Sequence, residues 1–253
     1  MSAADSNSNQ SLCIVLVRTR NPLNIGAVAR AMANFGAAQL RLVAPYDVAF
    51  REARSAVGAS ELLANAEVCQ SVAEAVTDCS LVIGTTAATN RSVSLPLIAL
   101  PEAAPQIAHA AHAGKVALLF GSEKRGLANQ DMSYCHWLMR IPTTEQSPSM
   151  NLAQSVVVVL YELARWNRSQ AIVRSEGIPA ADPPAKMQSL LRLAEVMHET
   201  LDSAGYYSEA AAAASEEQLR RLLNRMKLTE ADAVIVLGMF RQILWKLRAN
   251  SPE

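Results

Sequence analysis

The chain has 253 residues and a mass of 27.2 kDa, enough for one large domain or a domain with an appendage, so its core needs no disulfide or metal. Hydrophobic residues make up 51% and charged residues 18%, which excludes a disordered chain, and an aromatic content of 5% favours packed helices over a β-sandwich. Because 23 basic and 23 acidic side chains give a formal net charge of zero, any polyanion site must be a local patch.

The cysteines and histidines predict a reduced protein without a metal site. The four cysteines lie inside apolar runs and form no CxxC pair, so we expect buried thiols, and the four histidines have no companions at ligand spacing. The polar N-terminus carries no signal-like pattern, and no charge-free apolar stretch reaches the roughly 18 residues of a membrane span. We therefore expect a cytoplasmic protein that does not enter a membrane.

Continuous apolar runs alternate with helix-period segments through the first two thirds of the chain. The runs predict buried strands at Leu12 to Val17, Leu40 to Val43, Leu81 to Ile83, Val116 to Phe120 and Trp137 to Ile141. The segments between them predict helices at Ile25 to Phe35, Val72 to Val76 and Pro101 to Ala111. This alternation indicates an α/β fold, a parallel sheet with helices on both faces. The segment Asn151 to Trp166 contains a valine run that favours a strand, but its length and polar start favour a buried helix.

A glycine- and proline-containing stretch separates this part of the chain from a helical extension. Residues 169–184 have the composition of a linker. Beyond it, three amphipathic helices are predicted at Lys186 to Ser203, Glu216 to Lys227 and Glu230 to Arg248. The predicted division is therefore residues 1–168, a linker at 169–184 and an extension at 185–253.

Two motifs follow predicted strands at positions where α/β proteins bind ligands. In Asn21 to Gly36, a helix capped by Asn24 and closed by Gly36 places Gly26, Arg30 and Asn34 on one polar face, where the arginine either holds a phosphate or is simply solvated. In Phe120 to Leu127, two glycines frame charged residues, which suits either a ligand loop or a surface turn. The second motif matches no nucleoside triphosphate or dinucleotide fingerprint.

Two further loops and a basic segment complete the set. Two hydroxyl-rich loops, Gly84 to Ala87 and Ile141 to Ala153, each come after a predicted strand. In the second loop, Ser149 or Asn151 also caps the helix that follows. Loops that follow neighbouring parallel strands can converge on one cleft. The segment Gln218 to Leu228 carries a basic patch that either binds an RNA backbone or is a solvated helix face: Arg220, Arg221, Arg225 and Lys227.

Taken in order, three of these segments resemble the signature motifs of SpoU-type methyltransferases of the SPOUT class. They are Asn24-x-Gly26-x-x-x-Arg30, Leu119 to Leu127, and Ser149-Met-Asn-Leu-Ala153. The chain is most similar to the bacterial TrmJ family of tRNA 2′-O-methyltransferases, and its segment Leu190 to Arg248, which includes Leu219 to Arg225, also resembles that family's helical extension. The resemblance implies a deep trefoil knot in the α/β domain and a homodimer with active sites at the subunit interface. It also implies S-adenosylmethionine as methyl donor and tRNA as substrate, with methylation of cytidine or uridine at position 32 of the anticodon loop.

Carried over position by position, the resemblance assigns the site residues. The cofactor is expected at Thr85, Thr86, Ala87, Gly121, Ile141, Pro148, Ser149 and Met150. Arg30 and Ser149 are expected to be catalytic, and the substrate is expected at Asn24, Arg30, Glu123, Arg125, Asn151, Arg220, Arg221 and Arg225. Because a guanidinium stays protonated to about pH 12, we assign Arg30 the orientation of the target ribose or its phosphate and leave the proton acceptor open.

Two other interpretations remain at this point. SpoU-type motifs also occur in enzymes that methylate ribosomal RNA or other tRNA positions. A knotted domain could also bind RNA without catalysis.

Overall fold

A computed structural model describes residues 10–46, 60–87, 95–171, 183–207 and 212–249. Within these ranges seven strands form one sheet in which every pairing is parallel. The strands are β1 Leu12–Val17, β2 Gln39–Val43, β3 Glu67–Cys69, β4 Leu81–Thr85, β5 Leu97–Ala99, β6 Val116–Phe120 and β7 Trp137–Arg140. The predicted parallel α/β fold is confirmed, and β3 and β5 are additional to the strands predicted from the sequence.

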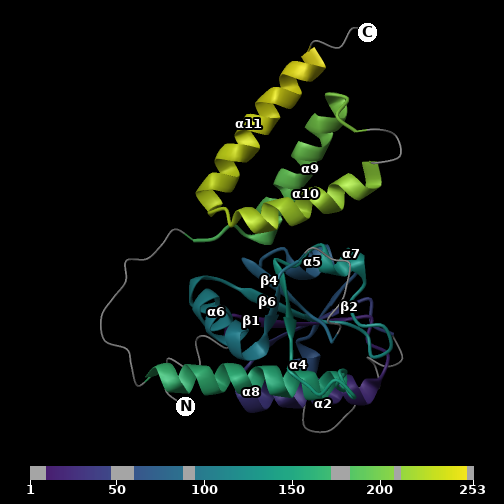
Figure 1. Ribbon diagram of the computed structural model, residues 1–253, viewed down its shortest axis with the longest axis vertical. Helices are drawn as coiled ribbons and strands as arrows, with labels where there is room; N and C mark the ends of the chain where they lie inside the picture. The colour runs from purple at the N-terminus through teal and green to yellow at the C-terminus, as the bar shows by residue number, and fades with distance from the viewer. Residues whose placement is uncertain (1–9, 47–59, 88–94, 172–182, 208–211, 250–253) are drawn as a thin grey trace.

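The helices cover both faces of the sheet (Figure 1). In the α/β part they are α2 Pro22–Phe35, α4 Ser60–Ala64, α5 Val72–Val76, α6 Leu100–Ala113, α7 Asn129–Met132 and α8 Leu152–Ala171. The ambiguous valine run is therefore helical, as predicted. The extension consists of α9 Met187–Ser203, α10 Ala212–Met226 and α11 Glu230–Ala249.

The alternation of side chains along each strand divides the core into two layers. On β1, Leu12, Ile14 and Leu16 pack with helices α2, α4, α6 and α8 on one face. Cys13, Val15 and Val17 point to the other face, where α5, α7 and the start of α9 cover the sheet. All four cysteines are buried and unpaired, as predicted. Burial raises the pKa of the Cys13 thiol to about 12, so this thiol is unreactive at neutral pH.

The strand order is β3-β2-β1-β6-β4-β7-β5. Strand β6 therefore lies between β1 and β4, and β7 lies between β4 and β5, although both enter the sheet later in the chain than their neighbours. The trefoil knot stays a prediction, because residues 88–94 between β4 and β5 lie outside the described residues. Most of the predicted linker, residues 172–182, also lies outside them, so the predicted division of the chain is not tested.

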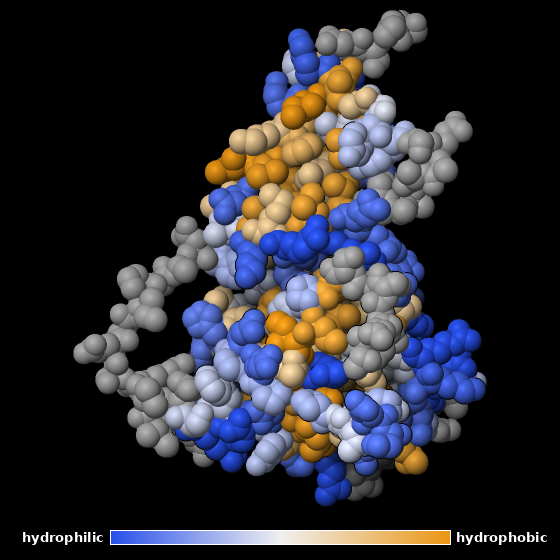
Figure 2. Space-filling model, in the orientation of Figure 1, coloured by the Kyte–Doolittle hydropathy of each residue, from blue (hydrophilic) through white to orange (hydrophobic). Residues whose placement is uncertain are grey.

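The helical extension packs against the α5 and α7 side of the sheet (Figure 1). The backbone N–H groups of Met187 and Gln188 donate to the carbonyl groups of Cys79 and Thr77, each at 2.7 Å. Figure 2 shows hydrophobic residues gathered over the outer part of the extension, where α11 exposes Val234, Ile235, Met239, Ile243 and Trp245. Among the described helices, none combines the length and apolar character needed to cross a membrane.

Candidate functional site

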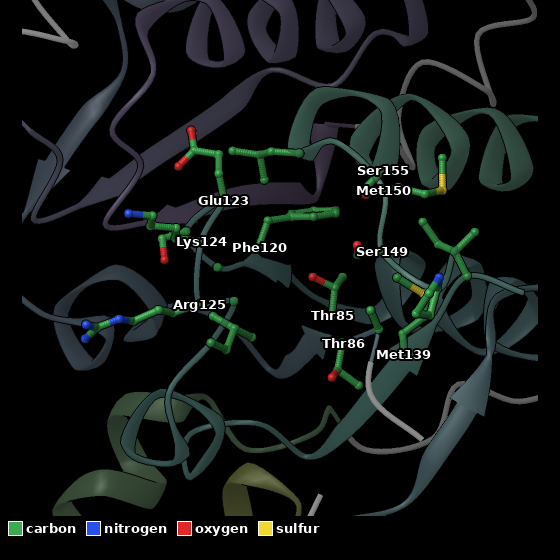
Figure 3. A pocket seen from close by; sticks show the side chains of 18 of the residues that line it. Thr85, Thr86, Phe120, Glu123, Lys124, Arg125, Met139, Ser149, Met150 and Ser155 are labelled. Atoms are coloured by element: carbon green, nitrogen blue, oxygen red, sulfur yellow. The ribbon is translucent and has the colours of Figure 1, made fainter. Parts of the chain in front are cut away.

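A cavity of about 450 Å³ opens at the carboxyl ends of β4, β6 and β7 (Figure 3). Three chain segments line it: residues 85–87 after β4, residues 120–127 after β6, and residues from Met139 to Ser155 around the loop after β7. The predicted convergence of these loops is confirmed. A cavity of this size and position is typical of small-molecule sites in parallel α/β proteins.

The loop after β6 forms a tight wall of this cavity. Its ends are closed by a hydrogen bond from the Gly126 N–H to the Ser122 carbonyl at 2.8 Å, and Gly126 takes a left-handed φ of 65°. A side chain at Gly121 would place its Cβ 2.0 Å from the Gly126 carbonyl carbon and 2.2 Å from the Leu127 nitrogen. Only glycine fits at Gly121 without moving the backbone, and this brings the wall close to any ligand.

Hydrogen bonds between neighbouring segments fix the other walls. The Thr85 hydroxyl donates to the Leu119 carbonyl at 2.9 Å, and the Thr86 N–H donates to the Met139 carbonyl at 3.0 Å. Figure 3 shows Thr85 and Ser149 near each other at the centre of the view and Arg125 extending away from them. The cavity thus combines hydroxyl groups with an apolar lining that includes Met139, Ile141, Met150 and Leu152.

A chain of polar contacts connects the cavity to helix α2. Asn24 is buried, and its side-chain amide donates to Glu123 Oε1 at 2.9 Å. The Asn24 oxygen accepts a hydrogen bond from Asn151 Nδ2 at 3.0 Å, while Asn151 Oδ1 caps α8 by accepting from the Ala153 N–H at 2.9 Å. Residues roughly 100 positions apart in the chain are thereby held in one network.

The environment of Glu123 keeps its carboxylate charged. Burial alone would raise the pKa of Glu123, but hydrogen bonds from Asn24 and from the backbone N–H groups of Glu123, Asn21 and Arg20 hold this pKa below its ordinary value. The Asn21 and Arg20 N–H groups lie 3.2 and 3.4 Å from its oxygens. Since these donors occupy the carboxylate, Glu123 is suited to positioning rather than to accepting a proton.

The helix cap differs from the sequence prediction. Asn24 was expected to cap α2, but Asn21 is the N-cap, and its side chain accepts from the Leu23 N–H at 2.9 Å. The reason is Pro22, which favours the first turn of a helix and so starts α2 earlier. Gly36 ends the helix in the left-handed conformation, as predicted.

Arg30 lies on the exposed face of α2 and does not line the cavity of its own chain. It follows Asn24 by six residues, a rise of about 9 Å and a rotation of about 240° along a helix. Among the described residues it makes no hydrogen bond or ion pair. The guanidinium is therefore exposed to solvent.

The structure places the remaining predicted site residues in three different settings. All eight residues predicted for the cofactor line the cavity, and Glu123 and Arg125 lie there too. Arg221 pairs with Glu217 one turn away, and Arg225 is exposed. Arg220 differs from the expected basic patch: its side chain is buried against the ring of Tyr134 and pairs with Glu216. Arg220 therefore cannot form part of an RNA surface in this arrangement.

Several lining residues were not singled out from the sequence. They are Phe120, Ser122, Lys124, Gly126, Leu127, Met139, Thr143, Leu152 and Ser155. Each lies in or next to a motif that was identified, so the position of the motifs at strand ends was the available signal. The ion pair of Arg18 with Asp131 joins residues 113 positions apart and had no such signal.

Within the described part of the chain, no group of histidine, cysteine or acidic side chains could hold a metal ion. His136 is instead a structural residue, since its Nδ1 accepts from the Val82 N–H at 3.1 Å. Burial lowers the pKa of His136 to about 4, so the ring is neutral.

Comparison with known proteins agrees with this geometry. Residues 11–161 match the SpoU rRNA methylase family. A tRNA (cytidine/uridine-2′-O-)-methyltransferase TrmJ of Sodalis glossinidius is 32% identical over 241 residues, which cover 94% of this chain and 93% of that protein. A crystal structure of TrmJ from Z. mobilis has a TM-score of 0.77 at 32% identity, covering 91% of this chain and 98% of that one. A probable methylase family protein from Haemophilus influenzae has a TM-score of 0.60 at 31% identity, covering 96% and 100%. The chain belongs to the SpoU methylase family.

Proposed function

We propose that this protein transfers a methyl group from S-adenosylmethionine to the ribose 2′-hydroxyl of cytidine, and of uridine, at position 32 of the tRNA anticodon loop. The observation that carries the proposal is the convergence of all eight predicted cofactor residues on one cavity. The relatives named tRNA (cytidine/uridine-2′-O-)-methyltransferase support the substrate class. A tRNA substrate also supports the expected cytoplasmic location.

The residues present fit S-adenosylmethionine. Gly121 lets the ligand approach the backbone closely, and the apolar lining with a few hydroxyl groups suits a nucleoside joined to an amino acid. When bound, S-adenosylmethionine supplies an electrophilic methyl group on a positively charged sulfur. The protein's main task is then to hold the ribose oxygen in line with that group.

Arg30 is proposed to orient the target ribose or its adjacent phosphate and to stabilise the oxygen as it loses its proton. Ser149 lines the cavity and is the second proposed catalytic residue. Glu123 and Asn151 are proposed to position the substrate through their contacts with Asn24. Arg125, Arg225 and Arg221 are proposed contacts for the RNA backbone.

A homodimer would bring Arg30 to a cavity that its own chain does not offer it. Helices α2 and α8 pack side by side on one face of the sheet (Figure 1). Their outer surface exposes Leu23 (79%), Val157 (40%) and Tyr161 (55%), an apolar set that a second copy could cover. We propose that Arg30 of one subunit acts at the cavity of the other.

A subunit-mixing experiment tests the shared site. Arg30→Ala and Ser149→Trp, which fills the cavity, are each expected to abolish methyl transfer. When the two variants are co-expressed, about half of the dimers contain one copy of each. In such a mixed dimer one of the two sites combines a wild-type Arg30 with an open cavity, so about a quarter of wild-type activity returns. If Arg30 served its own chain, no activity would return.

The reaction itself is tested by incubating the protein with methyl-labelled S-adenosylmethionine and, in separate reactions, bulk tRNA or ribosomal RNA, followed by mass spectrometry of the nucleosides. Labelled 2′-O-methylcytidine or 2′-O-methyluridine that maps to position 32 supports the full proposal. Label at another tRNA position, or only in ribosomal RNA, would show that the proposed substrate is wrong while the methyl-transfer activity stands. If neither RNA is methylated, the interpretation that the protein binds RNA without catalysis would replace the proposal.

A further inference from the structure

Residues 129–136, here called the α7 segment, join two walls of the cavity. The loop from Gly121 to Leu127 precedes the segment, and strand β7 with the Ile141 wall follows it. Within the segment, Asp131 accepts a hydrogen bond from the Ala128 N–H at 2.7 Å and pairs with Arg18 at the end of β1. The α7 segment therefore connects the two walls directly along the chain.

Helix α10 of the extension holds this segment from behind. The Arg220 side chain is buried, and its guanidinium carbon lies 4.9 Å from the centre of the Tyr134 ring. Arg220 Nη2 lies 3.4 Å from Ser133 Oγ, and Asn224 Nδ2 donates to the Cys135 carbonyl at 3.3 Å. Two side chains of α10 thus contact three consecutive residues of the α7 segment.

If the side chain at position 220 only packed against Tyr134, an apolar residue would serve as well as the buried guanidinium of Arg220. Its Nη1 pairs with Glu216 on the same helix at 2.7 Å, but among the described residues no acceptor lies within reach of the buried Nε. A buried charge with an unpaired donor contributes little net stability, whereas its geometry is directional. All contacts described for the Arg220 guanidinium outside α10 go to Ser133 and Tyr134.

We propose that Arg220 and Asn224 are positioning residues for the cofactor cavity. By holding Ser133 to Cys135, they keep the loop after β6 and the Ile141 wall at the spacing that S-adenosylmethionine requires. The extension is then part of the methyltransferase site, coupled to it through the α7 segment. The identity of the ligand rests on the function proposed above, whereas the coupling rests only on these contacts.

The first test measures S-adenosylmethionine binding to the full chain by calorimetry, without RNA. Arg220→Met keeps an unbranched apolar side chain over Tyr134 and removes the directional groups, and Asn224→Ala removes the bond to Cys135. Each is expected to weaken binding about fivefold or more, within the usual range of coupling between sites. The matched control is Arg192→Met on α9, because Arg192 is exposed and, within the part of the chain that the structure describes, pairs only with Glu195 on its own helix. The control should bind within twofold of wild type.

The second test follows amide hydrogen exchange with no ligand. In Arg220→Met, peptides covering residues 121–139 should exchange faster, while α2 and α8 and the Arg192→Met control keep wild-type rates. Faster exchange confined to α9 and α10, together with unchanged binding, would overturn the inference. If Arg220→Met does not fold, Tyr134→Leu removes the same contact from the other side and should give the same two results.

The two tests separate this inference from the proposed function. If the wild-type protein does not bind S-adenosylmethionine, the proposed cofactor is wrong, and the exchange result alone then decides whether α10 holds the cavity walls.

Discussion

Replacing Gly121 by alanine tests whether the wall of the cavity depends on direct backbone contact. The new Cβ would lie 2.0 Å from the Gly126 carbonyl carbon, against an ordinary contact of about 3.4 Å, so the two strands of the loop must separate by about 1.4 Å. Both contacted groups are backbone and cannot rotate away. We expect a loss of about 3 kcal/mol in the free energy of unfolding, which in a domain of this size lowers Tm by roughly 6–12 °C.

The assay is thermal unfolding followed by circular dichroism, with S-adenosylmethionine binding measured below the transition. Because Gly126 and Leu127 line the cavity, affinity should fall at least tenfold in parallel with the loss of stability. Gly26→Ala is the stability control, since a Cβ there meets no atom within 4 Å and alanine favours a helix by up to about 1 kcal/mol. A Gly121→Ala protein that melts and binds like wild type would refute the reasoning.

Two further predictions concern His136 and the ion pair of Asp78 with the buried Arg41. Since the pKa of His136 is about 4 in the folded state and 6.5 otherwise, the neutral ring contributes stability that is complete above pH 6.5 and declines towards pH 4, by up to about 3 kcal/mol. Urea unfolding of the wild type at pH 7.5 and 5 should show this decline in the free energy of unfolding, and His136→Gln should lack most of it. An equal decline between the two pH values in both proteins would contradict the assignment. Asp78→Asn should lower the free energy of unfolding by about 1–3 kcal/mol, because the buried Arg41 loses its bidentate partner. The pair of Arg192 and Glu195 gives the comparison, because both side chains are more than half exposed, and Glu195→Gln should change the free energy of unfolding by less than about 0.5 kcal/mol. Equal effects of the two substitutions would show that the burial of Arg41 does not matter here.

The parts of the fold that local pattern determines were predictable. The apolar runs of β1 and β6 are buried on both faces and read as strands without any tertiary information. Strands β3 and β5 were missed because each has three residues and lies at a sheet edge, where pairing rather than hydrophobicity defines it.

The candidate site was also predictable only in part. Strand-end loops identified the cavity, because parallel strands bring their carboxyl ends to one edge. The role of Asn24 was not predictable, since its partners Glu123 and Asn151 come from distant segments. Arg220 resembled a surface residue because its ring partner, Tyr134, is 86 positions away. Contacts that only the folded chain creates account for both differences.

The interleaved strand order has a consequence for synthesis on the ribosome. Strand β1 pairs with β2 early, but its other neighbour, β6, emerges roughly 100 residues later. At about 5–20 residues per second, one edge of this apolar strand waits roughly 5–20 s for its partner. During that interval the nascent chain exposes an unpaired edge of an apolar strand, so soluble yield should rise with chaperone co-expression.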